Sequence, residues 1–127
     1  MYDDLQIIKD EYQDLVNNPI LNFGITVQLK DDDNIHPNYR EWKCSIIGPR
    51  NSPYKGGLFI LYVEFPKEYP SECPIIYFKT PIYHTNVNPK KGESAHLGQI
   101  FISLFHRWRR TFTMREALIN IFTLFFS

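Results

Sequence analysis

The sequence predicts an α+β domain in which an N-terminal helix, a four-stranded antiparallel meander and a C-terminal helix follow one another along the chain. Apolar residues recur at helical spacing near both ends. Between them lie apolar runs of strand length, separated by short turns rich in Gly, Pro and Asp. The 127 residues fit one domain spanning 1–127 and leave no room for a second.

Two amphipathic helices are expected at the ends of this order. The apolar residues of the first are Leu5, Ile8, Tyr12, Leu15 and Val16. Pro19 ends that helix. The last helix is predicted over Met114–Phe126, because Thr113 and Glu116 form a capping-box pattern at its start. It is apolar on nearly every face.

Four strands are predicted over residues 23–29, 42–47, 58–65 and 75–80. The third is apolar on both faces, as is typical of a central strand. Three prolines interrupt the chain between the third strand and the fourth. From Pro81 to the last helix the sequence predicts an irregular segment of about thirty residues, a length at which loops usually carry a function or short helical turns.

The charges balance, with 14 Lys and Arg against 14 Asp and Glu, so neither a nucleic-acid nor a lipid-binding face is expected. We interpret the run Arg107-Trp108-Arg109-Arg110 as a solvated loop whose tryptophan packs inward. No segment is long and apolar enough for a membrane span, and no targeting segment is expected. Two cysteines are too few for a disulfide framework. The sequence favours an intracellular location, cytoplasmic by default, and leaves an organelle-resident complex, such as a mitochondrial one, open.

Several spaced motifs together resemble the ubiquitin-conjugating enzymes over most of the chain. They are Ile47-Gly48-Pro49, Ser52-Pro53-Tyr54-Lys55-Gly56-Gly57-Leu58-Phe59, Phe65-Pro66-Lys67-Glu68-Tyr69-Pro70 and Phe78-Lys79-Thr80-Pro81-Ile82-Tyr83-His84. The resemblance implies the ubiquitin-conjugating-enzyme-like fold without the usual last two helices. Non-catalytic variants of the family also lack these helices.

The resemblance also implies a cysteine that carries ubiquitin as a thioester. In the family this cysteine follows a Gly-x-Ile stretch, and here Gly98-Gln99-Ile100 is followed by Phe101. A phenyl ring cannot form an acyl intermediate. We therefore expect no enzymatic activity and no cofactor.

Family members carry His-Pro-Asn upstream of the cysteine, and the resemblance assigns the Asn to oxyanion stabilisation. This chain has His84-Thr85-Asn86, followed by a stretch about seven residues longer than usual before Phe101. We expect this insertion to misplace Asn86, whose amide then caps a turn or loop. The resemblance thus places a degenerate catalytic site, one that has lost its reacting group, at five positions: Phe101, His84, Thr85, Asn86 and Ser103.

No other residue stands out as a nucleophile or ligand. Cys44 lies on the apolar side of a strand and is expected to be an inert core thiol. Cys73 lies in the proline-rich crossing without a neighbouring base to activate it. The histidines and cysteines show no paired ligand spacing, so no metal is expected.

The surfaces through which family members meet their ligases are altered. Acidic residues replace a basic outer face on the first helix: Asp3, Asp4, Asp10, Glu11 and Asp14. Ser71 and Arg109-Arg110-Thr111 replace the usual loop residues. We expect a different partner surface on the last helix, formed by Ile119, Phe122, Phe125 and Phe126. The alternative is that these residues fold back onto the domain's own core.

The sequence therefore predicts a non-catalytic ubiquitin-conjugating-enzyme-like protein that is a protein-binding or structural subunit of a larger assembly, with other protein chains as partners. A second hypothesis is a variant that pairs with an active ubiquitin-conjugating enzyme and positions ubiquitin. A third is an active enzyme that uses Cys73 or a serine.

Overall fold

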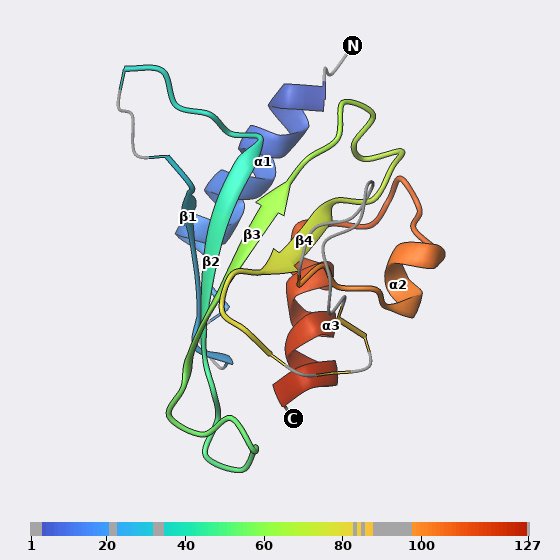
Figure 1. The fold of residues 1–127 in the computed structure, drawn as a ribbon. Coiled ribbons are helices and arrows are strands. Elements are labelled where there is room, and N and C mark those ends of the chain that lie inside the picture. Colours follow the sequence, from blue (N-terminus) through green and yellow to red (C-terminus); the bar gives the residue numbers. More distant parts are fainter. Residues whose placement is uncertain are drawn as a thin grey trace.

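The chain folds into three helices and four strands in the order that Figure 1 shows. The computed structural model describes residues 4–20, 23–31, 35–82, 84, 86–87 and 98–126. The elements are α1 (Asp4–Asn17), β1 (Ile25–Leu29), β2 (Glu41–Ile47), β3 (Leu58–Glu64), β4 (Ile75–Phe78), α2 (Ser103–His106) and α3 (Met114–Phe126). The α+β order of helix, four strands and helix is confirmed.

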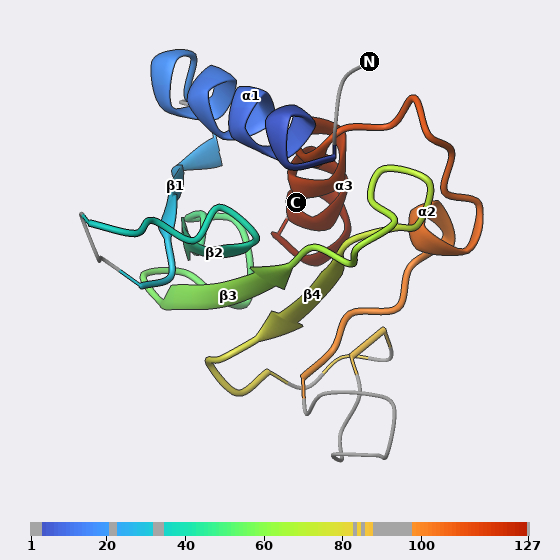
Figure 2. The ribbon, with the colours of Figure 1, turned by 90° about the horizontal axis from the view of Figure 1, so that it is seen from above.

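The strands form one antiparallel sheet in the order β1-β2-β3-β4. Burial alternates along β2 and β3, so that one face of the sheet is covered and the other is partly open. Trp42, Cys44 and Ile46 of β2 all lie on the covered face and are fully buried. Figure 2 shows α1 and α3 on the same side of the sheet, where they cover this face.

The helix α3 begins and ends at the residues that the apolar pattern predicts. The backbone N–H of Glu116 donates to Oγ1 of Thr113 at 3.3 Å, which is one half of the expected capping box. The buried positions of α3 follow helical spacing: Met114, Ala117, Leu118, Ile121, Phe122, Phe125 and Phe126. They form a single stripe that faces the sheet and α1.

The segment before α3 contains structure that the apolar pattern does not reveal. Gln99 forms a bridge with Tyr77 of β4, and Ile100 forms one with Val87. The four-residue helix α2 follows directly. A single turn is too short to show helical periodicity, and these bridges depend on residues far apart in the sequence.

Candidate functional site

The backbone around position 101 runs along the free edge of β4. The N–H of Ile100 donates to the carbonyl of Ile76 at 2.9 Å, and the N–H of Phe78 donates to the carbonyl of Gly98 at 2.8 Å. Gly98 has φ +82, and a Cβ there would lie 2.5 Å from the carbonyl oxygen of Phe78. Glycine is therefore required at position 98, both for the left-handed conformation and for the close approach. These contacts fix where Phe101 emerges from the sheet.

Asn86 lies directly beside Phe101. The N–H of Phe101 donates to the carbonyl of Asn86 at 2.7 Å, and Nδ2 of Asn86 donates to the carbonyl of Phe101 at 2.9 Å. Asn86 is thus in contact with position 101, and the expectation that the insertion misplaces it for oxyanion stabilisation stays a prediction. Val87 and Ile100 form an isolated bridge, which holds the two ends of the longer stretch next to each other. The amide of Asn86 holds a loop carbonyl, as the turn-capping interpretation predicts.

His84 supports the same frame through one ring nitrogen and through the packing of its ring. Its Nδ1 accepts a hydrogen bond from the backbone N–H of Asn86 at 3.1 Å. Its ring packs on Phe125 of α3, with ring centroids 4.3 Å apart. Thr85, the third predicted position of this stretch, lies outside the described residues.

Phe101 itself offers a surface without a nucleophile. Its side chain is 41% exposed. Ser103 is exposed at the first residue of α2. The described neighbourhood of position 101 therefore presents a phenyl ring, the Asn86 amide and the Ser103 hydroxyl, but no thiol. These groups can pack against a partner, but they cannot form a thioester.

The two thiols have different surroundings. Cys44 is fully buried on the inner face of the sheet, and this burial raises the pKa of its thiol to about 12. The prediction of an inert core thiol is confirmed for Cys44. Cys73 is half-buried, and burial raises the pKa of its thiol, with a smaller contribution from the Glu72 carboxylate. Neither thiol is held in the thiolate form that nucleophilic catalysis needs at neutral pH.

Across the described part of the chain, no three His, Cys, Asp or Glu side chains cluster closely enough to hold a metal ion. None of the helices within those same residues has the length and apolarity that crossing a bilayer requires.

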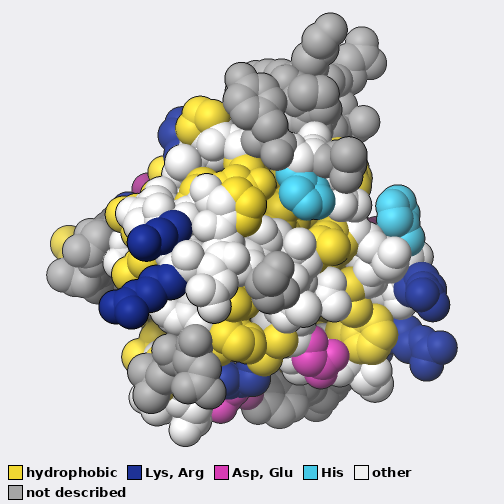
Figure 3. All heavy atoms as spheres, turned by 90° about the horizontal axis from the view of Figure 1, so that it is seen from below, with side chains coloured by type: hydrophobic (Ala, Val, Ile, Leu, Met, Phe, Trp, Pro, Cys, Tyr) yellow, Lys and Arg dark blue, Asp and Glu magenta, His cyan; other side chains and the backbone are white. Residues whose placement is uncertain are grey.

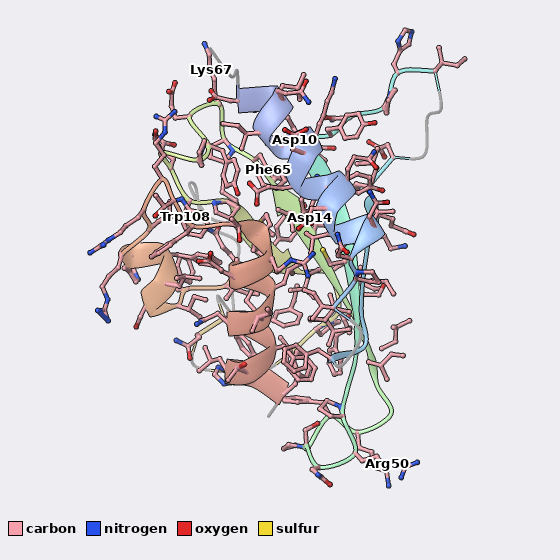
Figure 4. All side chains as sticks on the ribbon, turned by 180° about the vertical axis from the view of Figure 1, so that it is seen from behind. Asp10, Asp14, Arg50, Phe65, Lys67 and Trp108 are labelled. Atoms are coloured by element: carbon pink, nitrogen blue, oxygen red, sulfur yellow. The ribbon has the colours of Figure 1, made fainter. Side chains whose placement is uncertain are left out.

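The acidic face of α1 is divided in two by the contacts of its residues. Asp10 and Asp14 are exposed, and both extend from α1 in Figure 4. Glu11 points inward instead. It accepts a hydrogen bond from the Tyr69 hydroxyl at 2.6 Å and another from the backbone N–H of Met114 at 2.7 Å. The expectation that Glu11 belongs to an exposed acidic face is wrong, because its carboxylate caps α3.

These environments shift the pKa values of the acids in opposite directions. Burial raises the pKa of Glu11 above 4.5, and the hydrogen bonds from Tyr69 and Met114 only partly oppose the rise. The Arg115 guanidinium, 3.0 Å from Oδ2 of Asp14, lowers the pKa of that exposed carboxyl. Glu11 and Asp14 thus both join α1 to α3, one through a buried junction and one at the surface.

The predicted partner surface on α3 is largely buried within the domain itself. Phe122, Phe125 and Phe126 are 8%, 4% and 1% exposed, and Ile119 is half-buried. Phe122 stacks on Phe23 with ring centroids 4.4 Å apart.

Phe126 packs against two aromatic rings that do not belong to the predicted partner surface. Its centroid lies 5.2 Å from that of Phe59 and 5.5 Å from that of Tyr54. The expectation of an uncovered aromatic patch is wrong, because segments distant in sequence close over the end of the helix. The alternative, in which these residues fold back onto the core, describes the structure.

The arginine-rich loop places its tryptophan inward, as expected. Nε1 of Trp108 donates to the carbonyl of Pro70 at 2.8 Å, and its ring lies edge-on to Phe112 at 5.4 Å. Figure 4 shows Trp108 beside the turn that precedes it, with other side chains extending from that turn into solvent. Sequence reasoning passed over the arginines on either side as an ordinary solvated loop.

Comparisons with known proteins agree with this architecture. The family model described as ubiquitin-conjugating enzyme matches residues 7–127. Human ubiquitin-conjugating enzyme E2 G1 is 30% identical, with a TM-score of 0.78 over 92% of this chain and 89% of that chain. A putative ubiquitin conjugating enzyme from Plasmodium yoelii is 31% identical, with a TM-score of 0.76 over 98% of this chain and 73% of that chain.

Proposed function

Because the chain belongs to the ubiquitin-conjugating enzyme family, we propose that it is a non-catalytic member that acts as a protein-binding or structural subunit of a larger assembly. The observation that carries this proposal is Phe101, at the position that the resemblance assigns to the nucleophile. A frame held by Asn86 and Gly98 presents a phenyl ring there instead of a thiol. A binding role needs the fold and its surfaces, but it does not need the reacting group.

The state of the remaining thiols supports the proposal. A thioester needs a thiolate that is accessible to the activating enzyme. Cys44 is fully buried, and burial also raises the pKa of Cys73. A serine would need a general base, and no described side chain is hydrogen-bonded to the Ser103 hydroxyl in a way that could supply one.

A charging assay tests the proposal. The protein is incubated with activating enzyme, ATP and ubiquitin, and the products are separated with and without reductant. We expect no reductant-sensitive adduct, because no suitable thiol is present. An active ubiquitin-conjugating enzyme in the same reaction mixture provides the positive control.

The Cys73→Ser variant makes this assay specific. An adduct that forms on the native chain and disappears in the variant would identify Cys73 as a nucleophile and refute the non-catalytic role. An adduct that persists in the variant and resists reductant but not mild alkali would instead indicate an oxygen ester on serine.

The second candidate function is a variant that pairs with an active ubiquitin-conjugating enzyme and positions ubiquitin. Residues on the open face of the sheet favour it: Ile47 and Leu58 pair across β2 and β3 and are each 58% exposed. Exposed apolar neighbours of this kind commonly mark a protein contact. The test is the assembly of polyubiquitin by an active ubiquitin-conjugating enzyme, measured with and without this protein. An unchanged rate and unchanged linkage would rule it out for that enzyme.

A further inference from the structure

A short cationic segment in the loop before α3 has no role in the proposed site. His106, Arg107, Arg109 and Arg110 are all exposed, whereas Trp108 between them packs inward. Of the three arginines, Arg110 donates to Oγ of Ser71 at 3.3 Å. None of them forms a salt bridge within the described residues, whereas Arg115 of α3 does. Three guanidinium groups thus have no ion-pair partner among the described residues, and they lie on four consecutive residues.

Two of these arginines, Arg107 and Arg109, line a hollow of about 320 Å³. Its walls combine charged, polar and apolar groups: Ser103, Leu104, Arg107, Arg109, Phe112 and Asn120. Guanidinium groups bind carboxylates through paired hydrogen bonds, and Ser103 and Asn120 add neutral donors. Leu104 and Phe112 are half-buried and supply an apolar wall. This composition fits carboxylates that flank an apolar side chain.

The same contacts disfavour a nucleic acid as the ligand. Proteins that bind single strands offer exposed aromatic rings on which bases stack. The Trp108 ring is not available for stacking, because its Nε1 is bonded to the Pro70 carbonyl and its ring packs on Phe112. The chain as a whole carries a formal charge of +0, which provides no long basic track for a phosphate backbone.

We propose that the hollow lined by Arg107 and Arg109 is a docking site for an acidic segment of a partner protein, with carboxylates on the guanidinium groups and an apolar side chain against Phe112. This inference rests on the proposed protein-binding role, for which it names the surface and the partner chemistry. Figure 3 shows Lys and Arg side chains at the margins of one face, with hydrophobic side chains exposed beside them. The charge of the partner complements a cluster that the domain itself leaves unpaired.

Fluorescence anisotropy of a labelled peptide tests the proposal with the full chain. The probe is a short run of glutamates with a central leucine, and the matched neutral probe carries glutamines in place of the glutamates. We expect saturable binding of the acidic probe that weakens as salt is raised, and weaker binding of the neutral probe. No saturable binding of the acidic probe up to about 1 mM would overturn the proposal.

Two charge-reversed variants separate a built site from general attraction. Arg107→Glu with Arg109→Glu should weaken binding about tenfold or more, because both carboxylate partners are reversed. Arg50→Glu with Lys55→Glu changes the net charge by the same amount at exposed positions on the turn between β2 and β3. Figure 4 places Arg50 at the opposite end of the molecule from Trp108. Equal losses in both variants would refute a local site.

A third variant, Ser103→Glu with Asn120→Glu, keeps the arginines but places carboxylates in the hollow. Both positions are exposed, so the fold should tolerate the change, and circular dichroism checks that it does. We expect a loss of peptide binding comparable with that of the arginine variant. Tighter binding of an oligothymidine than of the acidic peptide would overturn the choice of a protein partner. The charging assay does not depend on these peptides, so failure here leaves the non-catalytic role to its own test.

Discussion

The edge around position 101 and the packing of α3 are built from different kinds of contact. At position 101, backbone groups of Asn86, Gly98 and Ile100 form the hydrogen bonds that hold the chain in place. Around α3, side chains such as those of Phe126 and Glu11 provide the contacts. Contacts made by backbone groups tolerate most changes of residue type, whereas contacts made by side chains do not. Position 101 should therefore accept other side chains without a change in the surrounding backbone geometry.

The largest effect is expected where side chains form the frame. Phe126→Ala should lower the free energy of unfolding by about 3–5 kcal/mol, because Phe126 is buried among aromatic rings and leaves a cavity. Leu124→Ala is the matched control on the same helix, since Leu124 is 43% exposed. Chemical denaturation monitored by circular dichroism measures both. A folded Phe126→Ala variant as stable as the control would contradict the packing described here.

Gly98 is the position near Phe101 where a change of residue type should not be tolerated, although the contacts there are made by backbone groups. Gly98→Ala should lower the free energy of unfolding by at least about 2 kcal/mol, for two reasons. Alanine is strained in the left-handed conformation, and its Cβ would clash with the Phe78 carbonyl. Gly56→Ala separates the two causes, since Gly56 has φ +76 but no atom within 4 Å of an added Cβ. Its cost should be about 1 kcal/mol. Equal thermal shifts for the two variants would show that the close approach of Gly98 to β4 is unimportant.

A smaller effect is expected from the buried junction between α1 and α3. Tyr69→Phe should lower the free energy of unfolding by about 1–3 kcal/mol, because it leaves the half-buried Glu11 carboxylate without one donor. It should also raise the pKa of Glu11 further, since the lost hydrogen bond favours the charged form. Tyr77→Phe is a suitable control, because the Tyr77 hydroxyl contacts Glu64 at a longer 3.3 Å. A cost no larger than that of the control would argue against the junction.

The smallest effects are two opposite dependences of stability on pH. The raised pKa of Glu11 means that the folded chain holds a proton more tightly than the unfolded chain does. Its contribution to stability is complete below pH 4.5 and is lost as the pH rises through the raised pKa. The lowered pKa of Asp14 acts in the other direction: its contribution is present above pH 3.8 and is lost as the pH falls through the lowered pKa.

Single substitutions separate these two contributions. In urea denaturation across this pH range, Glu11→Gln should remove the decline toward higher pH, and Asp14→Asn should remove the decline toward acid. Added salt should weaken the contribution of Asp14 more, because its pair with Arg115 lies at the surface. If Glu11→Gln leaves the profile unchanged, the buried carboxylate does not titrate in this window.

The sequence was sufficient for the parts of the fold that local pattern determines. Helical spacing predicted α1 and α3, and alternation with turn residues predicted the four strands in order. It could not reveal α2, because Ser103–His106 is a single turn. The inward orientation of Glu11 was also missed, because an acid on an amphipathic helix carries no local sign that a distant helix terminus needs its carboxylate.

The motif around Gly98 proposed Phe101 as the site position from the sequence, and that assignment stays a prediction. The contact between Asn86 and Phe101 was not predictable, because it joins residues on either side of the longer stretch. The burial of Phe122 was not predictable, because its cover comes from Phe23, about a hundred residues earlier in the chain. Contacts of this kind depend on the tertiary fold and leave no periodic trace.

The bridge between Val87 and Ile100 has a consequence for protein engineering. Val87 and Ile100 pair with each other, so the two points at which the stretch between them begins and ends are neighbours. Doubling the length of a connection between two such neighbouring points costs only about 0.6 kcal/mol in closure entropy. An affinity tag or a small reporter domain could therefore be inserted between these two residues without disturbing the sheet. The same junction could serve as the break point for a split version of the protein, whose halves would report on reassembly.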